Sequence, residues 1–153
     1  IREGLIWATL EHANILPFLG YYRDKDSEDL ELHLVSPYME NGDIRKYLET
    51  CEQQGDPIPC AGLVQGVLKG LIYIHELDIA HGDLKPSNIL VNDNGEAQLA
   101  DLGISKYCDD SDYTEFTDRV AQTIWHSPEV TKAGKRFRPS LKSDIWSFGC
   151  AWL

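Results

Sequence analysis

Apolar residues recur at steps of three and four positions through the middle of the chain. Leu63, Val67, Leu71 and Ile74 follow this spacing, which places them on one face of a helix. Such a face is typical of a helix that packs against a core. The pattern therefore predicts a buried helix of about five turns that ends near Glu76.

Shorter apolar runs that are bounded by turn residues predict strands. Two of them, at 15–22 and 30–35, flank a polar segment and predict a hairpin. Two more, at 89–91 and 97–100, are joined by Asn-Asp-Asn-Gly at 92–95. Because Asn-Gly is a strong signal for a tight turn, these runs predict a second hairpin.

Three further segments have helical patterns. One runs through 1–10, and Asp43 is placed to cap another over 44–52. The apolar stretch at the end of the chain opens with Ser143 and Asp144, which we expect to cap a last helix. We expect the aromatic residues of this last helix to lie in the core, namely Trp146, Phe148 and Trp152.

Composition narrows the classes of protein. The chain has 153 residues, of which 42% are hydrophobic and 25% charged, with a net charge of -11; these values fit one globular domain or part of a larger one. No apolar run approaches the roughly 18 residues of a membrane span, and the excess of acidic residues argues against nucleic acid as the main ligand. The four cysteines include no C-x-x-C pair, so we expect a reduced intracellular, cytoplasmic protein without a zinc site.

The most specific motifs are His-Gly-Asp-Leu-Lys-Pro-Ser-Asn at 81–88 and Asp-Leu-Gly at 101–103. They resemble the catalytic loop and the metal-binding turn of eukaryotic protein kinases, whose patterns are H-R-D-L-x-x-x-N and D-F-G. Phosphoryl transfer requires alignment of the acceptor hydroxyl, neutralisation of phosphate charge and bound magnesium. Residues of the required types are therefore present at the spacing that this chemistry needs.

The resemblance implies a role for each of these residues. Asp83 would orient the acceptor hydroxyl and accept its proton, and Lys85 would neutralise the transferring phosphoryl oxygens. Asn88, which also belongs to the catalytic set, and Asp101 would supply the oxygen ligands that magnesium prefers.

Other motifs follow in the order of the kinase family. Glu3 is similar to the family's helix C glutamate, Ser127-Pro128-Glu129 to the A-P-E that ends the activation segment, and 144–149 to helix F, whose Asp supports the catalytic loop. Residues 34–43 resemble the fifth strand and the hinge that binds adenine. The resemblance implies a nucleotide site formed by Glu3, Ser36 as gatekeeper, Pro37, Met39, Asp43 and Leu90.

These motifs predict the fold class. We expect an α+β, protein kinase-like fold that is partial, with helix C and a hairpin as a remnant of the N-terminal lobe at 1–36. The hinge would span 37–43, and a mainly helical, incomplete C-terminal lobe would span 44–153 up to helix F. No glycine-rich loop and no V-A-I-K lysine precede Glu3. We therefore expect this piece by itself to be inactive, as part of a larger kinase domain.

Three positions depart from the family pattern. Gly82 stands where most kinases have Arg, so activity should not wait for a phosphate on the activation segment, which would lack its guanidinium partner. The acidic segment 106–120 is predicted to be a long loop, and within it both a phosphorylation segment and a solvated loop remain open for 107–118. Leu102 replaces the Phe of D-F-G and can still pack on Trp7. In the family a Gly-Thr pair usually precedes the peptide-binding loop; here Thr123 lies one position later than that Thr.

The resemblance implies an ATP- and magnesium-dependent protein serine/threonine kinase that acts on protein substrates in signalling. Lys85, two residues after Asp83, is similar to serine/threonine kinases, and Trp7, Trp125 and the run at 15–20 are similar to the tyrosine-kinase-like branch. One alternative is a pseudokinase that binds ATP without turnover. Another is a small-molecule phosphotransferase with a similar H-G-D, although those enzymes usually have His at the position of Lys85.

Overall fold

Small antiparallel strand pairs alternate with helices along the chain. The computed structural model describes residues 6–23, 32–102, 106–107, 114–115, 123–132, 136–137 and 139–152. The elements are β1 (Gly20–Arg23), β2 (Leu32–Val35), α2 (Ile44–Gln54), α3 (Cys60–Glu76), β3 (Ile79–Ala80), the 3₁₀ helix η1 (Pro86–Asn88), β4 (Ile89–Val91), β5 (Ala97–Leu99), β6 (Lys106–Tyr107), β7 (Thr114–Glu115), the 3₁₀ helix η4 (Thr123–Trp125), α4 (Pro128–Lys132), β8 (Arg136–Phe137) and α5 (Leu141–Cys150).

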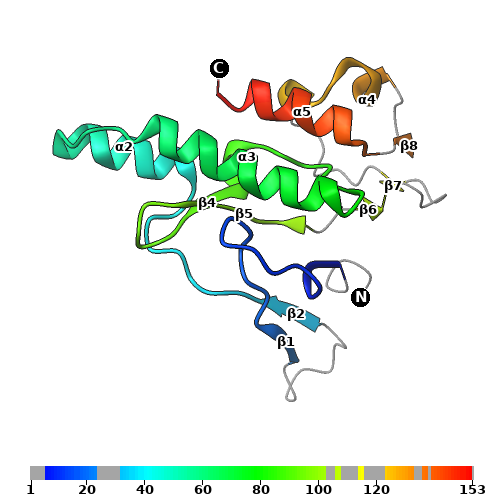
Figure 1. Ribbon diagram of the computed structural model, residues 1–153, viewed down its shortest axis with the longest axis horizontal. Coiled ribbons are helices and arrows are strands. Elements are labelled where there is room, and N and C mark those ends of the chain that lie inside the picture. Colours follow the sequence, from blue (N-terminus) through cyan, green and yellow to red (C-terminus); the bar gives the residue numbers. More distant parts are fainter. Residues whose placement is uncertain are drawn as a thin grey trace.

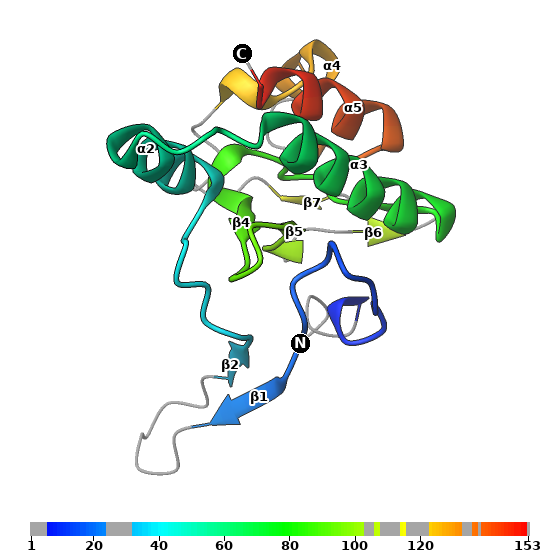
Figure 2. The ribbon, with the colours of Figure 1, turned by 60° about the vertical axis from the view of Figure 1, so that its left-hand side comes forward.

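The helices and the first hairpin occupy different ends of the molecule. Helices α2, α3 and α5 lie on one side of the β4–β5 hairpin, whereas β1 and β2 lie at the far end (Figure 1). The turned view shows the same separation, with the segment between β2 and α2 as the connection (Figure 2). The α+β class expected from the sequence is confirmed.

Both predicted hairpins are present. β1 pairs with β2 in the register Gly20↔Val35, and β4 pairs with β5 in the register Ile89↔Leu99. The turn of the second hairpin contains Gly95 at φ +76°, a conformation that glycine adopts without steric cost. The Asn-Gly pair therefore predicts the turn because position 95 has a positive φ, which glycine adopts easily.

Within the segment predicted to be a loop, the structure describes two short strands. β6 pairs with β3, and β7 pairs with β8. Each of these strands has two residues, which is too short to produce an alternating pattern in the sequence. The prediction of a continuous loop over 106–120 was wrong at these positions.

The predicted helices α2 and α3 form for local reasons. The Asp43 carboxylate caps α2 by accepting hydrogen bonds from the backbone N–H groups of Arg45, at 2.9 Å, and Lys46, at 3.1 Å. Gly55 ends the helix at φ +71°. The periodic face of α3 is fully buried, which confirms it as the central core helix; this face contains Leu63, Val67, Leu71 and Ile74.

The strand predicted over 15–22 is shorter than expected. Only its last part pairs with β2, because the preceding residues bond to β5 instead. Leu99 N–H donates to the Asn14 carbonyl at 2.9 Å, and Leu16 N–H donates to the Leu99 carbonyl at 2.8 Å. Pro17 follows and has no N–H to donate, so β1 begins only at Gly20.

The last helix begins earlier than predicted. Ser140, not Ser143 or Asp144, caps α5, and Ser143 completes a reciprocal capping box with it. Asp144 lies in the first turn with its side chain buried. Trp146 is 48% exposed, so its assignment to the core was wrong, whereas Phe148 and Trp152 pack edge to face against each other.

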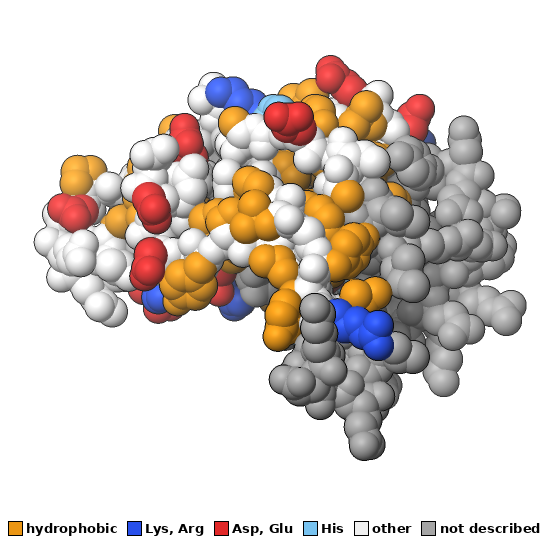
Figure 3. All heavy atoms as spheres, turned by 90° about the horizontal axis from the view of Figure 1, so that it is seen from below, with side chains coloured by type: hydrophobic (Ala, Val, Ile, Leu, Met, Phe, Trp, Pro, Cys, Tyr) orange, Lys and Arg blue, Asp and Glu red, His pale blue; other side chains and the backbone are white. Residues whose placement is uncertain are grey.

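Exposed apolar side chains gather on the β1–β2 hairpin. This hairpin faces the viewer when the molecule is seen from below, where apolar side chains cluster near the middle of the face (Figure 3). They include Leu19, Tyr21, Tyr22, Leu32 and Leu34. In the part of the chain that the structure describes, no helix combines the length and apolar character needed to cross a membrane.

A pair of glycine substitutions on α3 tests the packing of this helix. In Gly70→Ala, the new Cβ would lie 2.6 Å from the Asn14 carbonyl oxygen and 3.2 Å from a Leu99 methyl group, and we expect a loss of about 1–3 kcal/mol. In Gly62→Ala, the new Cβ meets nothing within 4 Å, and we expect a gain of about 0.5–1 kcal/mol. Urea unfolding of the protein that contains this chain measures both. Equal midpoints for the two variants would contradict the close approach.

Candidate active site

The residues expected to carry catalysis lie together in the 81–88 loop, which connects β3 to β4. Buried Leu84 and Pro86 anchor this loop. Lys85 Nζ lies 2.7 Å from Asp83 Oδ2. Asn88 Nδ2 donates to the same oxygen at 3.1 Å and to the Asp83 carbonyl at 2.8 Å. The three predicted catalytic residues therefore form one cluster.

The hydrogen bonds leave one face of Asp83 available. Lys85 and Asn88 both contact Asp83 through its Oδ2, and the Asp83 side chain keeps 24% of its surface exposed. Oδ1 is therefore the oxygen that can approach an acceptor hydroxyl. The Lys85 ammonium, which is 16% exposed, balances the carboxylate charge while keeping two further donors.

The backbone at the end of the β4–β5 hairpin brings Asp101 near Asn88 in the chain fold. Ala100 N–H donates to the Asn88 carbonyl at 2.9 Å, so Asp101 follows directly beside Asn88. Asp101 is exposed and has φ +55°, a conformation that is uncommon for residues other than glycine and that marks a sharp turn. Because Asn88 Nδ2 donates to Asp83, its Oδ1 is the amide atom that can bind a cation.

This donor set fits magnesium. Asn88 Oδ1 and the Asp101 carboxylate are hard oxygen ligands, and magnesium in proteins is commonly held by one or two carboxylates together with substrate phosphates and water. Among the described residues, no group of three or more His, Cys, Asp or Glu side chains could hold a metal ion. Phosphate oxygens and water would complete the coordination.

His81 connects the 81–88 loop to the strand that precedes Asp101. It is fully buried, its Nε2 lies 3.1 Å from the Ala100 carbonyl, and its Nδ1 lies 3.3 Å from the Asp83 N–H. A carbonyl only accepts and an N–H only donates, so the hydrogen of the neutral ring is assigned to Nε2. This ring therefore couples the position of Asp83 to that of Asp101.

The carboxylate of Asp144, in α5, binds the backbone at the start of the 81–88 loop. Its Oδ2 accepts from His81 N–H at 2.8 Å and from His75 Nε2 at 2.9 Å, and its Oδ1 accepts from Gly82 N–H at 2.9 Å. Asp144 is 1% exposed. The sequence indicated the support of the loop by Asp144. It did not indicate that His75 also binds this carboxylate.

Two of the residues expected to bind the nucleotide, Asp43 and Leu90, meet at β4. Asp43 forms an isolated bridge with Leu90, and Gly42 accepts from Val91 N–H at 3.0 Å. Asp43 Oδ1 already caps α2, which leaves Oδ2 for any ligand. Met39 packs against the core.

Two of the three remaining predicted residues can be located. Ser36 and Pro37 follow β2 and are half-buried, next to the segment that leads to α2. Glu3 lies outside the described residues. Its predicted contact therefore stays a prediction.

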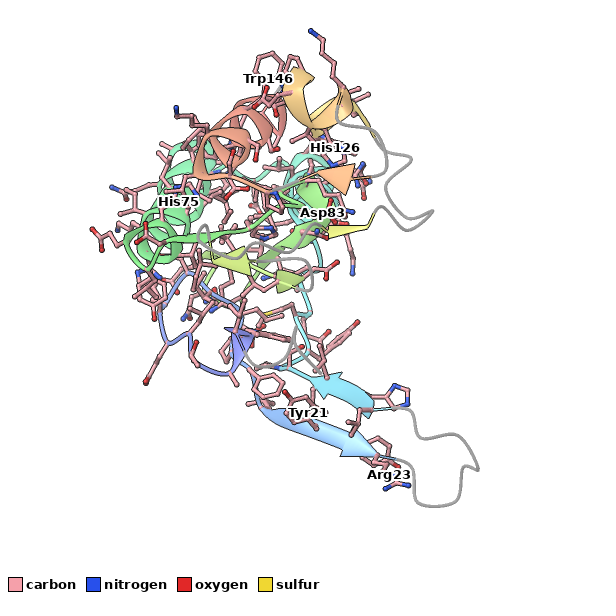
Figure 4. All side chains as sticks on the ribbon, turned by 90° about the vertical axis from the view of Figure 1, so that its right-hand side faces the viewer. Tyr21, Arg23, His75, Asp83, His126 and Trp146 are labelled. Atoms are coloured by element: carbon pink, nitrogen blue, oxygen red, sulfur yellow. The ribbon has the colours of Figure 1, made fainter. Side chains whose placement is uncertain are left out.

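His126 is a further residue that the sequence interpretation missed. It lies between η4 and α4 and is labelled, together with Asp83, in Figure 4. Burial lowers the pKa of His126 below its ordinary value; the charge of Asp83 opposes this effect, and that of Lys85 adds to it. Its position just before Ser127-Pro128-Glu129 is the only signal in the sequence that could have drawn attention to it.

A substitution of Asp144 tests the support of the loop. Asp144→Asn keeps the size of the side chain but replaces one carboxylate oxygen by a donor, so at least one of the three hydrogen bonds is lost. We expect a destabilisation of about 1–3 kcal/mol, measured by urea unfolding of the protein that contains this chain. Lys142→Ala, at an exposed position of the same helix, is the control and should stay within about 0.5 kcal/mol. A neutral Asp144→Asn would contradict the assigned role.

Comparisons with known proteins identify the family of the chain. A family model described as protein kinase domain matches residues 1–153. The mitogen-activated protein kinase mpk-1 of Caenorhabditis elegans is 33% identical over 153 residues, which are 98% of this chain and 33% of that protein. The chain thus spans about a third of the length of the curated relative it matches. It belongs to the protein kinase family.

Proposed function

We propose that the protein containing this chain is an ATP- and magnesium-dependent protein serine/threonine kinase. The observation that carries the proposal is the cluster of Asp83, Lys85 and Asn88, with Asp101 beside it at the end of the β4–β5 hairpin. The cluster would supply a base and a cation, and Asn88 and Asp101 would supply two oxygen ligands. Those are the parts that phosphoryl transfer requires.

Each residue of the cluster would have its own role in the reaction. Asp83 Oδ1 orients the acceptor hydroxyl and receives its proton as the new O–P bond forms and the bond from the terminal phosphorus to ADP breaks. Lys85 stays beside Asp83 and neutralises the oxygens of the phosphoryl group in transit. Asn88 fixes the Asp83 carboxylate through Nδ2.

Asn88 Oδ1 and the Asp101 carboxylate would hold magnesium. When bound, this ion neutralises phosphate charge and orients the terminal phosphoryl group. The sharp turn at Asp101 and the backbone bond between Ala100 and Asn88 keep the two ligands close.

The nucleotide would lie against the segment that connects β2 to α2. We assign adenine contacts to the backbone near Pro37 and Met39, with Ser36 as gatekeeper, and further contacts to Asp43 and Leu90, which are neighbours across a bridge. We assign the charge pairing of the family's helix C to Glu3. The separation of the β1–β2 hairpin from the helices (Figure 2) supports a division into 1–36, 37–43 and 44–153.

The finer features of the proposal rest on separate observations. Lys85, two positions after Asp83, supports serine/threonine rather than tyrosine acceptors. A relative that is named a protein kinase supports protein rather than small-molecule substrates. The tyrosine-kinase-like branch stays a prediction from Trp7 and Trp125. The free thiols of Cys51, Cys60 and Cys150 support a reducing, intracellular location.

Removal of the Asp83 carboxylate tests the enzyme. We expect Asp83→Asn to lower the turnover number for phosphorylation of a generic protein substrate about a hundredfold or more, because the acceptor hydroxyl loses its base. Transfer of radiolabelled phosphate from ATP by the whole protein is the measurement. Asp93→Asn, in the exposed turn of the β4–β5 hairpin, is the matched control and should keep full activity. ATP binding without any transfer by the unmodified protein would instead favour the pseudokinase.

The magnesium ligands have a separate test. We expect Asp101→Asn to raise the magnesium concentration that gives half-maximal activity by about tenfold or more, because one anionic ligand is lost. A titration of activity with magnesium at constant ATP measures this effect, and a chelator should abolish transfer in both proteins. An unchanged half-maximal concentration would remove Asp101 from the metal site.

A further inference from the structure

The chain contains two Asn-Gly pairs with matching neighbours. Each pair lies between two acidic residues, and the two stretches span 40–43 and 93–96. An asparagine side chain that precedes glycine is open to attack by the next main-chain nitrogen, because glycine has no side chain to hinder the approach. The sequence alone therefore gives both pairs the same chemical reactivity.

This reaction needs only water. The glycine nitrogen loses its proton to solvent and forms a bond to Cγ of the asparagine, while the amide nitrogen takes up a proton and leaves as ammonia. Water then opens the resulting succinimide ring. If the bond from Cγ to the glycine nitrogen breaks, the product is aspartate. If the main-chain bond breaks, the product is isoaspartate, in which the backbone runs through the side chain and is longer by one atom.

The attacking nitrogens of the two pairs are in equivalent states. Gly42 N–H donates to the Met39 carbonyl at 2.9 Å. Gly95 N–H donates to the Asn92 carbonyl, also at 2.9 Å. The two glycines have similar positive φ values, +70° and +76°. The glycine half of each pair therefore does not distinguish the two sites.

The asparagine side chains are in different states. Asn41 is half-buried, and its Nδ2 donates to the Asn92 carbonyl at 2.7 Å. Asn94 is exposed, and among the described residues only its backbone N–H is bonded, to Asn92 Oδ1 at 3.0 Å. Because Cγ must turn toward the next nitrogen, a hydrogen-bonded amide must first break its bond. Asn94 can therefore reach the reactive geometry more easily than Asn41.

One carbonyl connects the two pairs. The Asn92 carbonyl accepts from both Gly95 N–H and Asn41 Nδ2, where the turn of the β4–β5 hairpin lies beside the segment that leads into α2 (Figure 1). The loop is closed by Asn92 N–H, which donates to the Glu96 carbonyl at 3.0 Å. An additional backbone atom at position 94 would not fit this short loop. The position of the Asn92 carbonyl therefore depends on an intact Asn94.

We infer that the turn at 92–95 contains a site of spontaneous modification, at which Asn94 converts to aspartate and isoaspartate, and that the same turn protects Asn41 as long as it is intact. The inference does not depend on the proposed kinase function. Modification of Asn41 would alter the backbone next to Gly42, whose carbonyl binds Val91 N–H. The intact turn therefore also preserves the attachment of this segment to β4.

The first experiment compares both pairs in the same molecule. The whole protein is kept at mildly alkaline pH, folded or in urea, and the peptides that contain each pair are followed by mass spectrometry. In the folded protein we expect Asn94 to convert about tenfold faster than Asn41, which corresponds to the effect of one hydrogen bond. In urea the two rates should become similar, because the neighbouring residues match. Equal rates in the folded protein, or a difference that persists in urea, would overturn the inference.

The second experiment tests the protection of Asn41. Asn94→Gln retains an amide, but its longer side chain closes the ring much more slowly, so the turn stays intact. Conversion of Asn41 should accelerate in the unmodified protein once isoaspartate has formed at position 94, which labelling by an isoaspartyl methyltransferase detects. It should stay slow in Asn94→Gln. Asn94→Asp, which adds the charge without lengthening the backbone, is the matched control and should also keep it slow. Acceleration in either variant, or none in the unmodified protein, would contradict the protective role of the turn.

Discussion

The buried carboxylate of Asp144 organises the site. A carboxylate removed from water is costly unless its oxygens accept hydrogen bonds, and Asp144 accepts three, from two backbone N–H groups and the His75 ring. Two of those donors belong to His81 and Gly82, which directly precede the proposed base. The requirement to satisfy one buried charge therefore determines the path of the backbone that presents Asp83.

The same restraint extends to the expected metal ligands. His81 Nδ1 accepts a hydrogen bond from the Asp83 N–H, and His81 Nε2 lies beside the Ala100 carbonyl. The backbone of Ala100 in turn bonds to Asn88, and Asp101 is the next residue. A continuous chain of hydrogen bonds thus connects the support in α5 to both ends of the site, and buried networks of this kind are costly to leave partly satisfied.

The backbone at the site is held in uncommon conformations. Gly82 has φ +83° and Asp101 has φ +55°, both in the left-handed region. Glycine adopts this region at no steric cost, which fits the replacement of the family's Arg at position 82. Asp101 has no such freedom, and residues held in sparsely populated regions persist where the surrounding structure over-determines them. The hydrogen bonds through Ala100 provide that restraint.

The sequence by itself determined the elements whose cause is local. Asp43 caps α2 through its own neighbours, Asn-Gly turns the β4–β5 hairpin, and the face of α3 follows from its spacing. It also indicated the order of the catalytic motifs. Only the tertiary structure decided that His75 and Asp144, 69 residues apart, share a hydrogen bond, and that the charges of Asp83 and Lys85 act on His126. The start of α5 at Ser140 and the two-residue strands also escaped prediction, because competing serines and very short pairings leave no periodic pattern. Contacts between distant segments depend on how helices pack, and no local pattern of residues encodes that packing.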